Sequence, residues 1–261
     1  MPKLCANLTL LYNEVSFLER FRAAAQSGFK GVEYLFPYAY PCELLAGLLD
    51  ENGLVQVLHN LPAGDWERGD RGIGCLPDRV GEFQDSVGRA IEYATSLGCK
   101  QVNCLAGIAP DSVPRERAEQ TFVDNLKFAA PRFKNAGIKL LIEAINTRDI
   151  PGFFLTSTRQ SLDLIAKVGS DNLFVQYDIY HMQIMEGDLA RTIEANLPMI
   201  PHMQLADNPG RNEPGTGEIN YAFLLDFIDH CGYGGWIGCE YRPKTTTLES
   251  LAWADRCLAL G

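Results

Sequence analysis

The chain has 261 residues, of which 46% are hydrophobic, and its 33 acidic and 23 basic residues give a net charge of −10. Nucleic-acid binding depends on Lys and Arg that neutralise phosphates, so this balance and the lack of a basic cluster exclude nucleic acid as an expected partner. No apolar run approaches the ~20 residues of a membrane span, and the N-terminus leads into a strand without a signal peptide. We therefore expect a cytoplasmic protein with no membrane partner.

The eight cysteines contain no C-x-x-C pair. This spacing supports neither a zinc knuckle nor a thioredoxin-type motif. In a cytoplasmic protein we expect reduced thiols, most of them buried.

Strand and helix patterns alternate along the whole chain. Strands are predicted at Lys3–Leu8, Gly31–Tyr34, Val55–Leu58 and Gln101–Leu105, and in the apolar runs that end at Glu143, Asp178, Gln204 and Glu240. Helices are predicted over Ser16–Ser27 with a Ser16/Glu19 capping box, Cys42–Glu51, Val80–Leu97, within Pro114–Ala136, and over Thr156–Val168, Leu189–Leu197, Tyr221–His230 and Thr247–Ala259. This alternation implies parallel strands joined by right-handed crossovers. The pattern predicts an α/β fold, a single-domain (β/α)8 TIM barrel over residues 1–261.

The alternative fold is an open, doubly wound sheet. No G-x-G-x-x-G follows the first strand, which reads KLCANLTLLYNE, so the barrel is favoured. The polar, glycine-rich connection Asn60–Arg79 is too long for a simple turn. Because it contains Trp66, Ile73 and Leu76, we interpret it as an ordered lid.

Four predicted strands end on a side chain that carries oxygen: Glu143, Asp178, Gln204 and Glu240. In a TIM barrel the carboxyl ends of all strands meet at one face, which brings these side chains together. Three buried carboxylates would repel one another, and a divalent cation resolves this repulsion. An all-oxygen set suits Mg²⁺ or Mn²⁺, so the sequence predicts a metal site at these four residues.

Such a site is suited to moving a proton between adjacent carbons. A general base alone accelerates a reaction by about 10²- to 10⁴-fold, which is too little for removing a proton from carbon at neutral pH. A Lewis acid that stabilises an enediolate supplies the remainder. We hypothesise isomerisation or epimerisation of an α-hydroxy carbonyl compound, with Glu143 and Glu240 on opposite sides of the substrate.

Other polar residues fit around this site. His181, three residues after Asp178, and His59, just past the third strand, are predicted to contact substrate, whereas His202 could be a core residue and His230 a surface one. The metal and its three acids leave a charge of about −1, so an anionic substrate needs a cation. We expect Arg211, in the loop Asp207–Asn220, to bind the anionic group of the substrate, and Arg71 and Lys244 are lesser candidates for this role.

Long segments of the chain resemble the hydroxypyruvate isomerases of the xylose isomerase-like barrels. They are HNLPAGDW, RGIGCLPDR, IEAINTRDIPGF, VQYDIYHMQIMEG, QLADNPGRNEPGTGEINY and GWIGCEYRP. The resemblance implies interconversion of hydroxypyruvate and 2-hydroxy-3-oxopropanoate (tartronate semialdehyde), within glyoxylate metabolism. It also implies that Glu143 and Glu240 donate and accept the proton. Related epimerases commonly have histidine where Gln204 stands, so this chain departs from their pattern at one of the four metal positions.

Several alternatives stay open at this stage. The 2-oxo-tetronate isomerases share the GWIGCEY ending, and their substrate is longer by one hydroxymethylene unit, a difference worth roughly 1–3 kcal/mol in a pocket. Metal-dependent phosphodiester hydrolysis and a non-catalytic binding barrel are further possibilities. By analogy with related barrels, a homodimer or homotetramer is expected.

Overall fold

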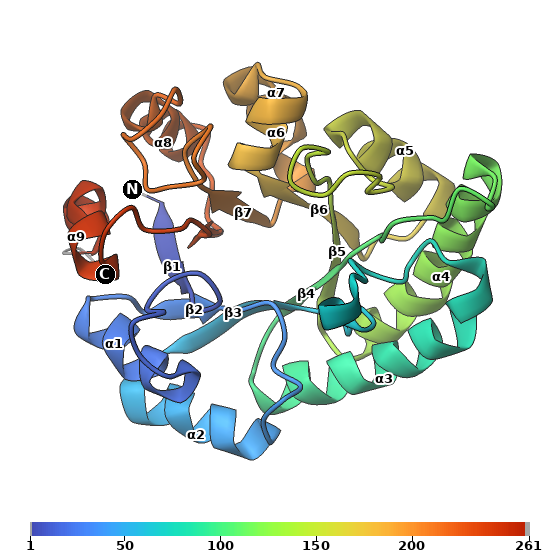
Figure 1. Ribbon diagram of the computed structural model, residues 1–261, viewed down its shortest axis with the longest axis horizontal. Coiled ribbons are helices and arrows are strands. Elements are labelled where there is room, and N and C mark those ends of the chain that lie inside the picture. The colour runs from blue at the N-terminus through green and yellow to red at the C-terminus, as the bar shows by residue number, and fades with distance from the viewer. Residues whose placement is uncertain (1, 259–261) are drawn as a thin grey trace.

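The structure is a computed structural model that describes residues 2–258. Its eight strands are parallel and follow one another in chain order around a closed barrel, with β8 paired to β1 (Figure 1). They are β1 Lys3–Asn7, β2 Gly31–Glu33, β3 Val55–Asn60, β4 Gln101–Cys104, β5 Lys139–Glu143, β6 Leu173–Asp178, β7 His202–Leu205 and β8 Trp236–Cys239. The predicted TIM barrel is confirmed.

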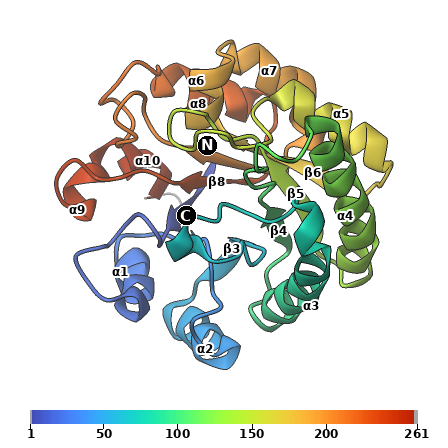
Figure 2. The ribbon, with the colours of Figure 1, turned by 45° about the vertical axis from the view of Figure 1, so that its right-hand side comes forward.

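Helices surround the barrel on its outside, as the turned view shows (Figure 2). They are α1 Arg20–Gln26, α2 Cys42–Asn52, α3 Val80–Ser96, α4 Arg115–Asn135, α5 Thr158–Val168, α6 Ile179–Met185, α7 Leu189–Asn196, α8 Tyr221–His230, α9 Thr247–Ser250 and α10 Asp255–Leu258. The Ser16/Glu19 capping box is present, but the first turn after it is a 3-10 helix. The sequence did not predict α6. The predicted last helix is divided into α9, a 3-10 turn and α10, and its end at Ala259 lies outside the described residues.

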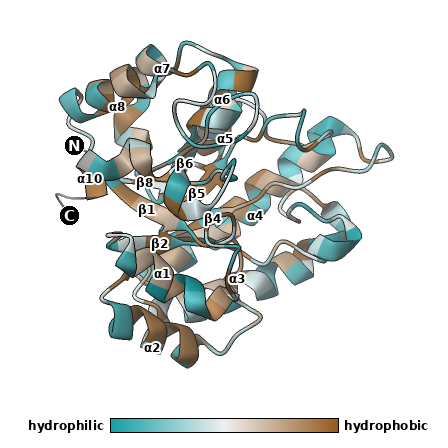
Figure 3. Cartoon of the chain, turned by 60° about the vertical axis from the view of Figure 1, so that its left-hand side comes forward, coloured by the Kyte–Doolittle hydropathy of each residue, from teal (hydrophilic) through white to brown (hydrophobic). Residues whose placement is uncertain are grey.

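The barrel interior has an apolar part and a polar part, at different levels along the strands. An apolar cluster fills one part, formed by Cys5, Val57, Leu58 and Leu141, with Phe174 and Trp236 packed against it. Nearer the carboxyl ends of the strands, buried polar side chains of β2, β6 and β7 fill the interior, and the acids lie at those ends. In Figure 3 the central strands are mostly hydrophobic, whereas the surrounding helices carry both hydrophobic and hydrophilic turns. The barrel therefore has an apolar floor beneath a polar site.

The connection Asn60–Arg79 is ordered, as predicted, and forms two 3-10 turns. Ile73 is buried within it. The Trp66 ring packs edge-on against Phe36 at 5.1 Å between ring centroids, and the Arg71 guanidinium lies 4.3 Å from the Trp66 ring centroid. These contacts fix the position of the lid over the barrel mouth.

The cysteines and two of the histidines lie where the sequence predicts. All eight cysteines are free thiols, and six of them are buried. His202 is buried and His230 is exposed. Within residues 2–258, none of the helices has both the length and the apolar character needed to cross a bilayer.

Gly238 in β8 leaves the room that Glu33 occupies inside the barrel. A Cβ added at position 238 would lie 2.2 Å from Glu33 Oε1. Since that carboxylate has four hydrogen-bond partners, it has no free direction in which to move. Glycine is therefore required here for space rather than for backbone conformation.

We expect Gly238→Ala to lower the free energy of unfolding by about 1–3 kcal/mol, because it overpacks a rigid polar interior. The matched control is Gly88→Ala in α3, where a Cβ would meet nothing within 4 Å. Removing a helix-interior glycine there should stabilise the protein by up to about 1 kcal/mol. Thermal unfolding followed by circular dichroism measures both, and equal effects of the two substitutions would contradict this packing argument.

Candidate active site

A cavity of about 350 Å³ opens at the carboxyl ends of the strands. Its size suits a small ligand, and this end of a TIM barrel is where active sites occur. Polar side chains from six of the eight strand ends and the loops that follow them line it: Asn7, Asn60, Glu143, Gln176, His181, Gln204, Arg211, Glu240 and Arg242. Its apolar wall includes Phe36, Trp66, Leu105 and Ile150.

The predicted convergence of acids is present: Glu143 and Glu240 line the cavity, and Asp178 lies beside them. One ligand atom from each of Glu143, Asp178, His181 and Glu240 lies within 4.8 Å of the others, and all four residues are buried. Gln204 lies beside them, because β7 pairs with β6 so that Gln204 is opposite Asp178. The structure thus brings together all four residues predicted at the metal site and adds His181.

Burial and mutual repulsion raise the pKa values of both glutamates. For Glu143, desolvation is the largest cause, and the charges of Glu240 and Asp178 raise the pKa further. For Glu240, desolvation again dominates, opposed by the positive charge of Arg211. Two carboxyl groups this close cannot both ionise freely, so in the metal-free protein they retain a proton near neutral pH.

The hydrogen-bond partners of His181 fix its tautomer. Asn146 Oδ1 accepts backbone N–H bonds from residues 148 and 149, so its amide Nδ2 must face His181 Nδ1, 2.6 Å away. Nδ1 therefore accepts, and the ring proton sits on Nε2, which lies 3.4 Å from Asp178 Oδ2 and 4.0 Å from Glu143 Oε1. Burial lowers the pKa of His181 to about 4, so the ring is neutral. His181 presents an N–H donor to the cavity, which suits an oxygen partner better than a metal ion.

Arg211 is the cation nearest to the acids. Its Nη2 donates to Glu240 Oε2 at 2.7 Å, and its Nη1 donates to Asp149 Oδ2 at 3.3 Å. The guanidinium also lies 5.1 Å from the ring centroid of Tyr180. Its Nε is buried and has no partner among residues 2–258. Arg211 lines the predicted cavity, but its two terminal nitrogens are already bound to protein carboxylates.

Beneath the acids, Glu33 orients a row of amide side chains. Glu33 Oε1 accepts from Asn7 Nδ2 at 2.9 Å and Gln204 Nε2 at 2.8 Å, and its Oε2 lies 2.7 Å from His202 Nε2. Because an ionised carboxylate only accepts, Gln204 must turn its oxygen away from it, where that oxygen accepts from Gln176 Nε2 at 2.6 Å. The oxygen of Gln176 is left buried without a partner in the described chain.

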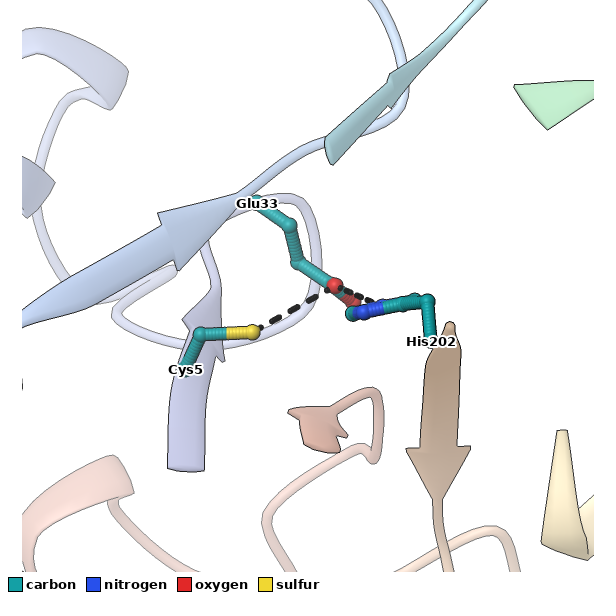
Figure 4. A group of neighbouring side chains, drawn as sticks. All are labelled: Cys5, Glu33 and His202. Carbon is teal, nitrogen blue, oxygen red and sulfur yellow. Dashed lines mark hydrogen bonds and ion pairs between the residues drawn. The ribbon is translucent and has the colours of Figure 1, made fainter. Parts of the chain in front are cut away.

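Cys5, Glu33 and His202 form a second compact group of possible metal ligands, shown in Figure 4. The Cys5 thiol donates to Glu33 Oε2 at 3.5 Å, and burial raises the pKa of the thiol. The Glu33 carboxylate already accepts hydrogen bonds from several N–H and S–H groups. The hydrogens of these donors point toward the carboxylate oxygens, where a bound cation would have to lie. We therefore interpret this group as a hydrogen-bonded support for the site above it.

The upper group fits a divalent cation better. Glu143, Asp178 and Glu240 place three carboxylates against one guanidinium, so negative charge is in excess. The Gln204 oxygen is held in a fixed orientation and has a second lone pair available. Mg²⁺ and Mn²⁺ favour such an oxygen set. These four residues could hold the ion, while His181 donates beside it.

His59 is the predicted site residue that the structure does not bring to the cavity. Its Nδ1 lies 3.3 Å from the Tyr38 hydroxyl, and Tyr38 packs against Tyr93 of α3, so the ring lies on the helix side of β3. Side chains alternate along a strand, and Asn60, the next residue, lines the cavity instead. Arg71 and Lys244, the lesser candidates, are not among the residues that line it.

Sequence reasoning missed several polar residues of the site. Asn103 Nδ2 donates to Glu143 Oε2 at 2.9 Å, and Asn7 Nδ2 lies 3.4 Å from Glu240 Oε1. Asn7 and Glu33 are the last residues of their strands, and Asn103 is the last but one of β4. The argument that identified Glu143, a polar residue closing a buried strand, applies equally to Asn7 and Glu33.

Comparison with known proteins places this geometry in a family. The profile of the xylose isomerase-like TIM barrels matches residues 21–257. The chain is 53% identical to hydroxypyruvate isomerase of Escherichia coli K12, over 98% of this chain and 99% of that protein. It is 46% identical to 2-oxo-tetronate isomerase of Cupriavidus necator, over 97% of each.

Solved structures with the same fold are also similar to this chain. One described as AP endonuclease, family 2, from Brucella melitensis has a TM-score of 0.96 and 43% identity, covering 98% of this chain and 99% of that one. An L-ribulose 3-epimerase has a TM-score of 0.80 at 22% identity, covering 100% and 95%, and shows the shared fold. The chain belongs to the xylose isomerase-like TIM barrel family.

Proposed function

We propose that this protein is an isomerase that interconverts hydroxypyruvate and 2-hydroxy-3-oxopropanoate by moving a proton between adjacent carbons. The observation that carries the proposal is the pair Glu143 and Glu240, two buried glutamates from β5 and the end of β8 in one cavity. The similarity to hydroxypyruvate isomerase over nearly the whole chain supports the choice of substrate.

The proposed reaction uses the two glutamates in turn. One glutamate removes a proton from C3 of hydroxypyruvate, which forms an enediolate across C2 and C3. The proton on the C3 oxygen then moves to the C2 oxygen, and the other glutamate protonates C2 to give the aldehyde. The reverse reaction exchanges the two roles.

The electrostatics of the cavity suit this sequence. Burial raises the pKa values of both glutamates, so each carboxylate is a stronger base toward a proton on carbon than an exposed glutamate. The Nε2–H of His181 is a donor for a substrate oxygen.

We assign the metal position to Glu143, Asp178, Gln204 and Glu240. When bound, Mg²⁺ or Mn²⁺ supplies a Lewis acid that stabilises negative charge on substrate oxygens. Asp178 is held for this role because its Oδ1 accepts the backbone N–H groups of Tyr180 and His181 at 2.8 and 3.3 Å, which caps α6. Its Oδ2 lies 3.4 Å from His181 Nε2.

The second candidate is isomerisation of 2-oxo-tetronate, which the 46% identity to a 2-oxo-tetronate isomerase favours. Both substrates present the same keto acid end, so Arg and N–H donors that suit one suit the other. The test is to assay both acids in parallel with the purified protein. Higher kcat/KM for hydroxypyruvate supports the first proposal, and higher kcat/KM for the four-carbon acid supports the second.

We expect Glu143→Gln and Glu240→Gln each to lower kcat by about 10²-fold or more, because glutamine cannot carry the proton. Neither should lower the thermal stability of the metal-free protein, since each replaces a carboxyl group whose ionisation is already opposed. Exposed Glu92 of α3 is the control, and Glu92→Gln should leave kcat unchanged. A Glu143→Gln or Glu240→Gln enzyme with ordinary kcat would disprove that residue's role.

We expect Mn²⁺ binding at pH 7 to release about one proton, because the raised pKa values hold a proton that the metal must displace. Affinity should therefore rise with pH up to the raised pKa values and then level off. Calorimetric titration in two buffers of different ionisation heat measures the release. Equal binding heat in the two buffers would mean that no proton is released and would contradict a proton shared by Glu143 and Glu240. The Glu143→Gln protein should release fewer protons than the wild type.

A further inference from the structure

The cavity needs a cation that is not already bound to protein carboxylates. Glu143 and Glu240 line it, Asp178 lies beside them, and Arg211 offsets one of these three acids. With a divalent cation bound, the ion and Arg211 only balance the acids, so an anionic keto acid gains net attraction only if a second positive group meets its carboxylate. Arginine is the best candidate, because its planar fork binds a carboxylate with two parallel N–H bonds.

Arg211, the residue predicted for this task, is poorly placed to perform it. Both of its terminal nitrogens donate to carboxylates, one on Glu240 and one on Asp149, and its side chain is only 18% exposed. A third carboxylate could bind as a fork only after one of these bonds breaks. Arg211 therefore serves to neutralise Glu240.

Arg242 has the opposite properties. It lines the same cavity and is exposed, and nothing within residues 2–258 forms a hydrogen bond or ion pair with its guanidinium. Its backbone, however, is held on both sides. Its N–H donates to the Arg211 carbonyl at 2.7 Å, and its own carbonyl accepts from Asn212 Nδ2 at 2.7 Å. An anchored backbone with an open guanidinium is suited to receive a ligand.

We propose that Arg242 binds the carboxylate of the anionic substrate and so selects keto acids over uncharged sugars. This inference rests on the proposed function and deepens it. Because Arg242 follows Glu240 by two residues, the carboxylate is held near the rim of the cavity. The hydroxy-ketone end is then directed toward Glu143 and Glu240.

The test compares Arg242→Gln with Lys244→Gln. Each substitution removes one positive charge, but Lys244 does not line the cavity, so it controls for long-range electrostatics. Two quantities are measured: KM and kcat for hydroxypyruvate, and the calorimetric Kd for glycerate. Glycerate is a three-carbon anion that has no ketone or aldehyde carbonyl and therefore cannot isomerise.

Arg242→Gln should raise KM and the glycerate Kd by about 10- to 100-fold, the loss expected for charge-assisted hydrogen bonds. Arg242→Lys should recover part of this loss, and Lys244→Gln should have little effect. Mn²⁺ affinity and thermal stability should not change in any variant. Equal effects of Arg242→Gln and Lys244→Gln, or an unchanged glycerate Kd, would overturn the proposal.

The two proposals can fail separately. If the wild-type protein binds glycerate through Arg242 but does not convert hydroxypyruvate, the proposed reaction is wrong and the anion site stands. If it converts hydroxypyruvate and Arg242→Gln does so with unchanged KM, the anion site is wrong and the reaction stands.

Discussion

The cost of burying three carboxylates at one end of the barrel determines the arrangement of everything around them. Glu143, Asp178 and Glu240 would repel one another strongly in a low-dielectric site. The structure offsets this repulsion with donors: Asn103 on Glu143, backbone amides on Asp178, and Arg211 on Glu240. These donors offset the repulsion only in part, and the pKa values of the two glutamates stay raised as a result. A bound divalent cation would relieve that remaining repulsion, which is why the site favours one.

The orientation of neutral polar groups follows from the same constraint. An amide side chain can present either its oxygen or its nitrogen, and the wrong choice would place a donor hydrogen where a cation is needed. Glu33 removes this ambiguity for Gln204, since it only accepts, and Gly238 provides the space for Glu33. Asn146 does the same for the tautomer of His181. The buried residues beneath the site therefore determine which atoms its polar side chains present to the cavity.

Strand order and the convergent acids could be predicted from the sequence because both depend on local patterns. Glu143 and Asp178 each end an apolar run, and a barrel brings such ends together. His59 shows the limit of that reasoning: its position at a strand end was right, but the alternation of side chains turns it outward and Asn60 inward. Which face a strand residue occupies depends on the register of its neighbours, and β2 and β3 pair with a register shift. The sequence also could not show that Arg211 is already bound to Glu240 and Asp149, since that depends on how distant loops pack.

The central claim is that a proton, carried by side chains, moves between C3 and C2 of the substrate. The most direct measurement is NMR of the product formed from hydroxypyruvate in D₂O, with a sample lacking protein as the blank. Transfer by two glutamates predicts deuterium at C2 of 2-hydroxy-3-oxopropanoate from the first turnover, because the second glutamate exchanges its proton with solvent. Conversion with the original C3 hydrogen retained at C2 would show that one hydrogen travels between the carbons, directly or on a single shielded base, and would contradict this account.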